Sequence, residues 1–387
     1  MKILIGCEVF YPYLYGGGEV FAYEVSRQLA KMGHEVHIVC PRDSFDRPNS
    51  HLPLLSSVDG VKVHRVRGEF RYRHGIQSLP YMLRMYIETS RIIHETGIQI
   101  VNAQTFRPCL PLLAAAKKNS VPCIVTIFDI YSRGSMYGLE NWLKFYSTFG
   151  IFGWATEQMI LRLPFSRVIT NSNATKNKIR KLLPSARIHV VKCAVDLQNY
   201  PRNYPKKTPG MVLYLGRLAY YKNVEDLVEV VARLRPKRND ATLTIAGTGP
   251  LESELRKMAD SMNYVTFIRN PKGSDKIKLL RSAEVLVIPS SEEGFGIVLL
   301  ESNAAYTPFV CYNIPALKEL VQETQGGLLA KHRNVDDLSN KILQIIENKT
   351  FARRLAMSGR NAVEKRFSWT HTAERIERIF QDTLNSS

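Results

Sequence analysis

Short apolar runs alternate with longer amphipathic segments along the first half of the chain. The runs are rich in β-branched residues and occupy positions 2–7, 35–40, 61–66, 98–103, 123–127 and 167–170. The segments between them are long enough for helices, for example 18–32, 81–96 and 110–119. Because alternating strands and helices form parallel sheets, the pattern predicts a doubly wound α/β domain.

The same pattern restarts after an interruption rich in Pro, Asn and Lys at residues 200–210. Further apolar runs follow at 211–215, 242–246, 264–268, 285–289 and 309–312. We interpret the interruption as a linker between two Rossmann-like domains, residues 1–198 and 199–368, with a final segment at 369–387. Such sheets bind ligands beyond the carboxyl ends of their strands, so two facing domains would enclose a substrate in a cleft.

The composition is that of a soluble globular protein, with 45% hydrophobic and 23% charged residues among 387. The chain has no uninterrupted apolar segment of about 20 residues, and its start runs directly into a predicted strand. We therefore expect a cytosolic protein. The six cysteines show no C-x-x-C pairing and lie in or beside apolar strands, which favours reduced core thiols over a disulfide framework or a zinc site.

The chain is strongly basic, with a net charge of +18. The excess can reflect solubility together with an anionic nucleotide, nucleic acid or an anionic membrane surface. No zinc-finger, basic-zipper or RNA-recognition motif is present, so we expect no nucleic-acid partner. Four arginines and two aromatics in 65–74 form either a solvated loop or a head-group contact. The aromatics of 136–163 form either core packing or a lipid-facing surface.

Residues 289–303 read as the end of a strand, a Gly-containing loop and the start of a helix. Unpaired N–H groups at a helix start favour an anion, and glycines let it come close. The cradle for such a phosphate consists of Gly294, Phe295, Gly296 and Ile297. A carboxylate beside a phosphate is unfavourable, so Glu293 and Glu301 are better suited to accept hydrogen bonds from hydroxyls. Phosphate and hydroxyls together indicate a nucleotide sugar.

Two other turns follow predicted strands of the same sheet. Arg217 and Lys222 flank a strand-to-helix turn and can both reach a diphosphate, although as plain surface charges they would have no such meaning. Gly249 belongs to the turn 246–250, which fits either close approach of a ligand or a simple turn. In the first domain, Gly17 and Gly18 either bring a ligand close to a helix start or form a tight turn, and they lack the G-x-G-x-x-G spacing.

With these residues side by side, the chain resembles the family 4 glycosyltransferases of the GT-B fold. The resemblance is carried by the E-x7-E pattern from Glu293 to Glu301, by the Gly-Arg-Leu of 216–218 with Lys222, by the turn 246–250, and by the Gly-rich loop ahead of Glu19. It spans nearly the whole chain and is looser over 40–165. The ending 366–369 is also similar to the family's, where the last helix crosses back onto the first domain.

The resemblance implies retaining transfer of a hexose from a UDP- or GDP-sugar to a glycan or lipid-linked glycan, without an essential metal or other cofactor. Arg217 and Lys222 would neutralise the leaving diphosphate. Glu293 would hold donor-sugar hydroxyls without acting as a covalent nucleophile, and Glu301 would hold the ribose. By its position after a strand, the segment ending at Asn270 would contact the base. An anionic membrane at the cytoplasmic face is a further expected partner.

Two positions depart from the family pattern. Phe128 stands where the family often has a histidine, and the preceding strand ends at Gln104 where a histidine is also common. The Phe128 departure is consistent with a different sugar, with a polar contact that comes from Asp129 or Tyr131 instead, or with lost activity. We place Asp129 and Tyr131 with Glu19 on the acceptor side. Two alternatives to transfer remain: a nucleotide-sugar epimerase of the same architecture, for which no acid and base can be identified, and a non-catalytic nucleotide-sugar-binding protein.

Overall fold

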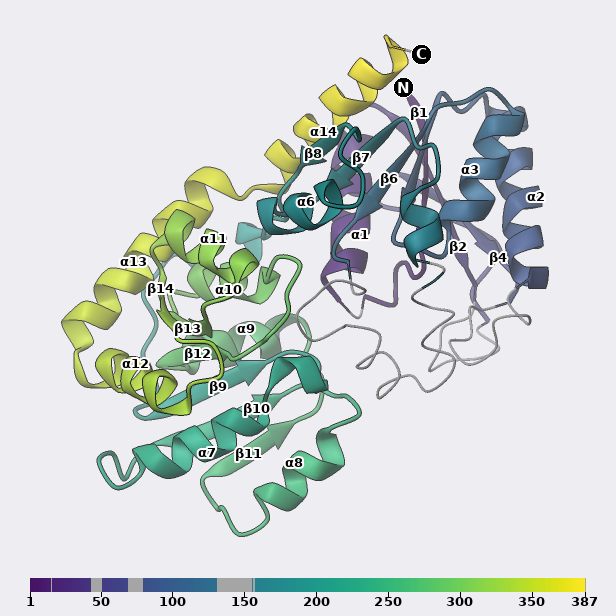
Figure 1. The fold of residues 1–387 in the computed structure, drawn as a ribbon. Coiled ribbons are helices and arrows are strands. Elements are labelled where there is room, and N and C mark those ends of the chain that lie inside the picture. The colour runs from purple at the N-terminus through teal and green to yellow at the C-terminus, as the bar shows by residue number, and fades with distance from the viewer. Residues whose placement is uncertain (15, 43–50, 69–78, 131–154, 156, 387) are drawn as a thin grey trace. The chain divides into compact units, whose positions relative to one another are not determined.

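The computed structural model describes the chain except for residues 15, 43–50, 69–78, 131–154, 156 and 387 (Figure 1). The described residues form two compact units. The first consists of residues 1–193 together with 369–387, and the second of residues 194–368. Each unit is an α/β domain, with a parallel sheet in the second unit and a sheet in the first that is parallel except at one edge strand, which confirms the predicted fold class.

The first unit contains an eight-stranded sheet in the order β3-β4-β2-β1-β5-β6-β7-β8. Its strands are β1 (Lys2–Gly6), β2 (Glu35–Pro41), β3 (Leu55–Val58), β4 (Val61–Val66), β5 (Ile100–Gln104), β6 (Cys123–Ile127), β7 (Arg167–Thr170) and β8 (Ile188–Val190). Its helices are α1 (Gly17–Lys31), α2 (Leu79–Thr96), α3 (Cys109–Lys118), α6 (Asn173–Arg180) and α14 (Trp369–Leu384). The final helix thus belongs to the first unit, where it packs on α1 through a Phe21–Trp369 ring contact at 6.0 Å.

The edge strand β3 is the one antiparallel member among the described strands of this sheet, and the sequence analysis did not predict it. It pairs with β4 through a tight turn in which Asp59 (φ 50°) and Gly60 (φ 82°) both have positive φ. An Asp-Gly pair of this kind is the usual signal for a two-residue hairpin. The signal is present in the sequence, but the short polar run beside it does not resemble a buried strand.

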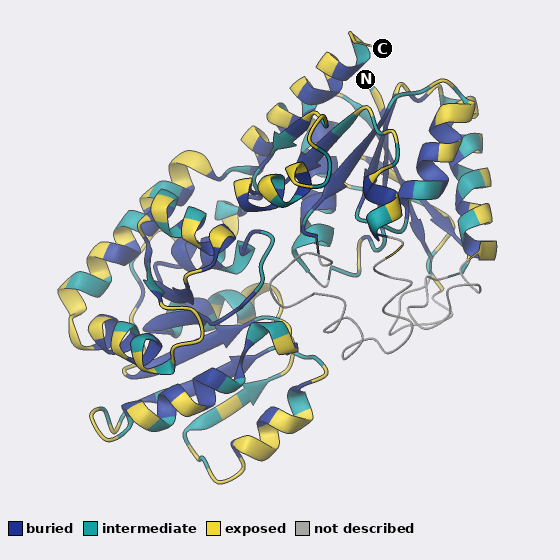
Figure 2. Ribbon diagram, viewed as in Figure 1, coloured by how far each residue is buried: buried dark blue, intermediate teal, exposed yellow. Residues whose placement is uncertain are grey.

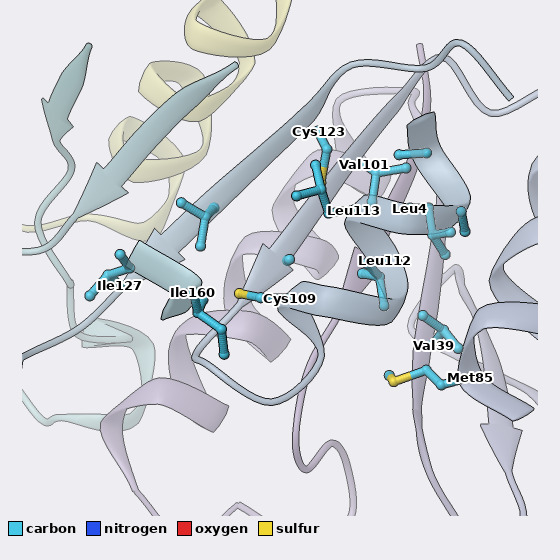
Figure 3. Close-up of a cluster of buried hydrophobic side chains, with 14 of the residues drawn as sticks. Leu4, Val39, Met85, Val101, Cys109, Leu112, Leu113, Cys123, Ile127 and Ile160 are labelled. Carbon is cyan, nitrogen blue, oxygen red and sulfur yellow. The ribbon is translucent and has the colours of Figure 1, made fainter. Parts of the chain in front are cut away.

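One hydrophobic cluster of the first unit lies between its sheet and the helices α2 and α3. Figure 3 shows side chains of this cluster from β1, β5, β6 and α3, with Leu4 and Leu112 at one end and Ile127 beside Ile160 at the other. A Cβ on Gly6 would lie 2.1 Å from Leu112 Cδ2, so glycine lets α3 pack closely on β1. All six cysteines are free and buried, as predicted.

The second unit contains a parallel six-stranded sheet in the order β11-β10-β9-β12-β13-β14. Its strands are β9 (Met211–Leu215), β10 (Thr242–Ala246), β11 (Val265–Ile268), β12 (Val285–Ile288), β13 (Phe309–Tyr312) and β14 (Gly327–Ala330). Its helices are α7 (Glu225–Leu234), α8 (Glu252–Met258), α9 (Gly273–Ser282), α10 (Ile297–Ala304), α11 (Pro315–Thr324), α12 (Val335–Glu347) and α13 (Lys349–Arg366). Figure 2 shows buried strands covered by helices that each keep one exposed face.

Candidate functional site

The sheet of the second unit reverses its winding between β9 and β12. The chain proceeds outward from β9 to β10 and β11, and then starts again on the other side of β9 with β12, β13 and β14. Ligands of open α/β sheets bind at such a switch point, beyond the carboxyl ends of the strands. The loops that follow β9 and β12 carry Arg217, Lys222 and Glu293, three of the predicted site residues.

These two loops are joined by hydrogen bonds around Asn223. The residue has φ 46°, a left-handed conformation that asparagine tolerates better than most residues. Its Nδ2 donates to the carbonyl of Pro289 at 2.7 Å and to Ser291 Oγ at 2.8 Å. The backbone N–H of Ser291 in turn donates to the carbonyl of Tyr221 at 2.8 Å. These hydrogen bonds fix the loop after β9 against the loop after β12, and with them the relative positions of the side chains that the two loops carry.

Lys222 and Glu293 form an ion pair across this junction. Lys222 Nζ lies 2.5 Å from Glu293 Oε1, and Ser290 Oγ donates to the same oxygen at 2.9 Å. Burial favours a lower pKa for Lys222, but the charge of Glu293, the neighbouring Tyr221 and the hydrogen bond to Glu293 raise it above its usual value. The pairing with Glu293 thus favours the charged form of Lys222 at the switch point.

The start of α10 has the geometry expected of an anion cradle. Gly296 caps the helix at φ 91°, and a Cβ there would lie 2.7 Å from Leu317 Cδ2, so a side chain would be both strained and crowded. Phe295 is buried, whereas Gly294 and Ile297 are half-buried. The N–H of Leu299 already donates to the carbonyl of Gly296 at 2.9 Å. The N–H groups of Ile297 and Val298 precede this first bond of the helix, where they suit an anion or water.

Glu301 lies one turn further along α10 and also has a lysine partner. Lys276 Nζ, on α9, lies 2.6 Å from Glu301 Oε1. Burial, and then the charge of Glu301, raise the pKa of Tyr200, which places this linker residue near the same carboxylate. The sequence analysis named neither Lys276 nor Tyr200, because no motif links them to the E-x7-E pattern.

The glycines of the turn after β10 have a structural role. A Cβ on Gly247 would lie 1.8 Å from the carbonyl oxygen of Gly216, and one on Gly249 would lie 2.2 Å from that of Leu218. The close approach at Gly249 is therefore to the chain's own backbone. This backbone contact fixes the loop that carries Arg217. The carbonyl of Arg217 also accepts a 2.7 Å hydrogen bond from Tyr214 Oη.

Arg217 and Asn270 are both exposed. Arg217 lies on the same loop as Lys222, next to the switch point. Asn270 (φ 44°) follows the edge strand β11, which β10 separates from β9. Arg217, Lys222, Glu293 and the start of α10 thus lie at the carboxyl ends of the strands near the switch point. Asn270 follows the outermost strand, β11, and lies further along the same edge of the sheet.

In the first unit, the Gly-rich loop begins α1 beside Phe128. A Cβ on Gly18 would lie 3.3 Å from the Phe128 ring, and that ring packs edge-on against Phe21 with centroids 5.2 Å apart. Gly17 is the first helical residue, and Glu19 lies in the first turn, where the helix dipole favours a carboxylate. Phe128 is thus an apolar support for the helix start.

Asp129, predicted on the acceptor side, is already engaged within the first unit. It is buried, and its Oδ1 accepts from Lys178 Nζ at 2.9 Å and from the backbone N–H of Ile130 at 2.8 Å. Tyr131 lies outside the described residues. So do residues 69–78 and 131–154, which hold most of the arginine-rich and aromatic segments.

Arg65 does not belong to an exposed loop, contrary to the interpretation of 65–74. It lies buried on β4, where Nη1 donates to the carbonyl of Pro53 at 3.1 Å and to Ser56 Oγ at 2.7 Å. Nη2 donates to the carbonyl of Tyr11 at 3.2 Å. Its charge anchors the chain around β3 and is not presented at the surface.

The switch point of the first unit, between β1 and β5, contains a residue that the sequence analysis missed. Glu8 Oε1, just after β1, accepts from Thr105 Oγ1 at 2.8 Å and from the backbone N–H of Arg107 at 3.3 Å, just after β5. The sequence signal that could have identified Glu8 as a site residue is its position directly after the first predicted strand. In the described part of the chain, this site included, no His, Cys, Asp and Glu side chains group as a metal site would require. Within the same residues, no helix is long and apolar enough to cross a membrane.

Both halves of the chain match models of glycosyltransferase families. Residues 15–199 match the model "Glycosyltransferase Family 4", and residues 198–362 match "Glycosyl transferases group 1". A glycogen synthase of Mycobacterium tuberculosis is 26% identical over 98% of this chain and 94% of its own length. A GDP-mannose-dependent phosphatidylinositol monomannoside mannosyltransferase of Corynebacterium glutamicum is 30% identical over 45% of this chain and 48% of its own.

Two solved structures share the fold over the full length of both chains. Sucrose-phosphate synthase from Thermosynechococcus elongatus superposes with a TM-score of 0.82 at 18% identity. Anabaena HepE, solved in complex with UDP-glucose, superposes with a TM-score of 0.74 at 18% identity. At these identities the likeness establishes the architecture of both units.

Proposed function

The chain belongs to the family 4 glycosyltransferases of the GT-B fold, and on that premise we propose that it transfers a hexose from a nucleoside diphosphate sugar to a glycan with retention of configuration. The observation that carries the proposal is the Lys222–Glu293 pair at 2.5 Å, located at the sheet switch point beside the start of α10. A cation, a carboxylate and free N–H groups together suit a diphosphate linked to a sugar.

Each group has a separate task in this proposal. Lys222 and Arg217 offset the negative charge that develops on the leaving diphosphate, a task that a metal ion performs in other enzymes. The N–H groups at the start of α10 contact the phosphates or the sugar. Glu293 accepts hydrogen bonds from sugar hydroxyls, and its fixed position beside Lys222 orients the sugar relative to the leaving group.

The reaction then proceeds on one face of the sugar. The bond between the anomeric carbon and the phosphate oxygen breaks, and a bond to the acceptor oxygen forms on the same side. The departing phosphate oxygen takes the proton of the acceptor hydroxyl, so that no protein group needs to act as a covalent nucleophile. The products are a glycoside with retained configuration and a nucleoside diphosphate.

We further propose that the donor is a UDP- or GDP-sugar. The support comes from the relatives, since HepE was solved with UDP-glucose and the C. glutamicum relative is GDP-mannose-dependent. A thermal-shift screen of UDP, GDP, ADP and their sugars tests the choice, because a ligand present at 100 times its dissociation constant stabilises a protein by about 2.7 kcal/mol. A screen in which none of them raises the melting temperature would contradict donor binding at this site.

We propose a lipid-linked glycan acceptor, reached at the cytoplasmic face of a membrane. Leu79, Leu83 and Ile87 are 59%, 59% and 56% exposed and recur every fourth residue along one side of α2. Exposed Arg67 and Arg84 lie beside this stripe, joined by a hydrogen bond from Arg84 to the carbonyl of Arg67. An apolar stripe flanked by cations suits an anionic lipid surface. The buried free cysteines are also typical of a reducing compartment.

The alternatives differ in a measurable product. An epimerase changes the sugar of the donor without an acceptor, and a non-catalytic binder releases nothing. Radiolabelled UDP- and GDP-sugars, incubated with the protein and a lipid extract, distinguish the three. We expect release of nucleoside diphosphate and label in the lipid fraction. Bound donor without release, with any acceptor pool, would support the non-catalytic alternative.

A further inference from the structure

The second carboxylate of the E-x7-E pattern is held by a lysine from a different helix. Lys276 lies in the first turn of α9 and Glu301 in the second turn of α10, and Figure 1 shows these two helices together in the second unit. Lys276 Nζ is 2.6 Å from Glu301 Oε1. The Lys276 and Glu301 side chains are 30% and 14% exposed, so the pair is partly buried and still reached by solvent.

The contact uses only one of the two carboxylate oxygens. Among the described residues, no donor is hydrogen-bonded to Glu301 Oε2. Glu293 shows the same pattern, since Lys222 and Ser290 both donate to its Oε1. Each carboxylate is therefore fixed through one oxygen and leaves the other for a hydroxyl.

We propose that Lys276 is a positioning and specificity-determining residue, which orients Glu301 so that Oε2 accepts a hydroxyl of the nucleotide's ribose. The inference rests on the proposed function, in which Glu301 faces the ribose of a nucleoside diphosphate sugar. A glutamate side chain can adopt several rotamers, and a lysine bound to one of its oxygens favours one of them. The ammonium group also offsets repulsion between Glu301 and the diphosphate.

The two contributions of Lys276 predict different results. Charge compensation alone would favour ribose and deoxyribose nucleotides equally. Orientation of Oε2 would favour only the nucleotides that carry the hydroxyl. The ratio of their affinities is therefore a readout that a purely structural role, or a general electrostatic role, does not change.

The test measures dissociation constants of UDP and GDP and of their 2′-deoxy and 3′-deoxy forms. We expect the wild type to prefer the ribose form of one nucleotide by about tenfold or more, as for a hydrogen bond to a charged acceptor. Glu301→Gln and Lys276→Met should each reduce this preference at least threefold, whereas Lys276→Arg should largely retain it. The matched control is Lys278→Met, which removes the same charge from the same helix at a side chain that is 76% exposed.

The outcomes separate this inference from the function on which it rests. The positioning role would be overturned if Lys276→Met had the same ratio of ribose to deoxyribose affinity as the wild type, whether or not both nucleotides bound more weakly. Failure of the wild type to bind any of the nucleotides would overturn the proposed function, and the inference with it. Thermal unfolding of each variant shows whether the fold is retained.

Discussion

Lys222 and Glu293 lie 71 residues apart in the chain, and their side chains meet at 2.5 Å where β9 and β12 end side by side. The two residues come from the loops that follow these parallel neighbouring strands. Hydrogen bonds from Asn223 to Pro289 and Ser291 lock these loops together. The fold thus places a cation and a carboxylate at its switch point before any ligand arrives, which is the preorganisation that electrostatic catalysis requires.

Arg217→Ala and Glu301→Ala should affect different kinetic constants. Arg217 is expected to act on the leaving diphosphate, so its loss should lower kcat by roughly 10²–10³. Glu301 is expected to bind the ribose, so its loss should mainly raise the KM for the donor. Steady-state kinetics with varied donor measures both. Unchanged donor affinity in Glu301→Ala would contradict the separate roles.

Gly247→Ala should destabilise the second unit more than an ordinary glycine replacement. The added Cβ would lie 1.8 Å from the carbonyl oxygen of Gly216, so the loop that carries Arg217 must shift. We expect a loss of more than about 2 kcal/mol in unfolding free energy, together with weaker donor binding. Gly273→Ala is the control, because its φ is +51° with nothing within 4 Å, and it should cost about 1–2 kcal/mol of strain alone. Equal stabilities of the two variants would exclude a packing role for Gly247.

The sequence predicted the central strands and the switch-point residues, but not the contacts between helices. Apolar runs such as 285–289 identify their strands directly, and Glu293 and Lys222 stand at the ends of such runs. Lys276 was missed because a lysine in a helix gives no indication of which neighbouring helix it faces. Arg65 was misplaced because its charge suggested a loop, whereas it is buried on β4 and one of its hydrogen-bond partners, Ser56, comes from the edge strand β3.

His64 should make the first unit sensitive to acid. Its Nε2 lies 3.0 Å from His37 Nδ1 across β2 and β4. The charged groups that act on the pair are Lys2, Glu35, Lys62, Glu88 and Arg91. Burial and the neighbouring His37 lower the pKa of His64 from 6.5 to about 4. Between these values the unfolded chain binds a proton that the folded chain does not. The contribution of neutral His64 to folding stability is therefore fully present above pH 6.5 and is lost as the pH falls toward 4.

Urea unfolding at pH 7 and pH 5 measures this loss. The His64 contribution to the decrease should be about 2 kcal/mol. His64→Gln, which keeps a hydrogen-bonding side chain without a titrating ring, should reduce the decrease by that amount. His51→Gln, at an exposed position, is the control and should leave the decrease unchanged. An identical pH dependence in wild type and His64→Gln would show that the histidine pair does not titrate on unfolding.

The exposed stripe of α2 should contribute to membrane binding. Serine at positions 79, 83 and 87 should reduce flotation with vesicles that contain phosphatidylglycerol, because the apolar contact is lost. Neutralising Arg67 and Arg84 should remove mainly the salt-sensitive part of binding. Serine at Leu55 and Met357, which are 63% and 39% exposed elsewhere, is the matched control. Flotation that is unaffected by the α2 changes would remove this surface from the proposal.

The central claim is that a diphosphate leaves from the site at Lys222 and Glu293. The most direct measurement is the initial rate of nucleoside diphosphate release from a radiolabelled donor, compared between the wild type and Lys222→Met with EDTA present. Lys237→Met, at an exposed position on the same unit, is the charge control. We expect the wild type and the control to turn over in EDTA, and Lys222→Met to lose roughly 10²–10³ in rate while retaining its fold. Equal rates in all three proteins, or a wild type that is inactive until a divalent metal is restored, would contradict the account.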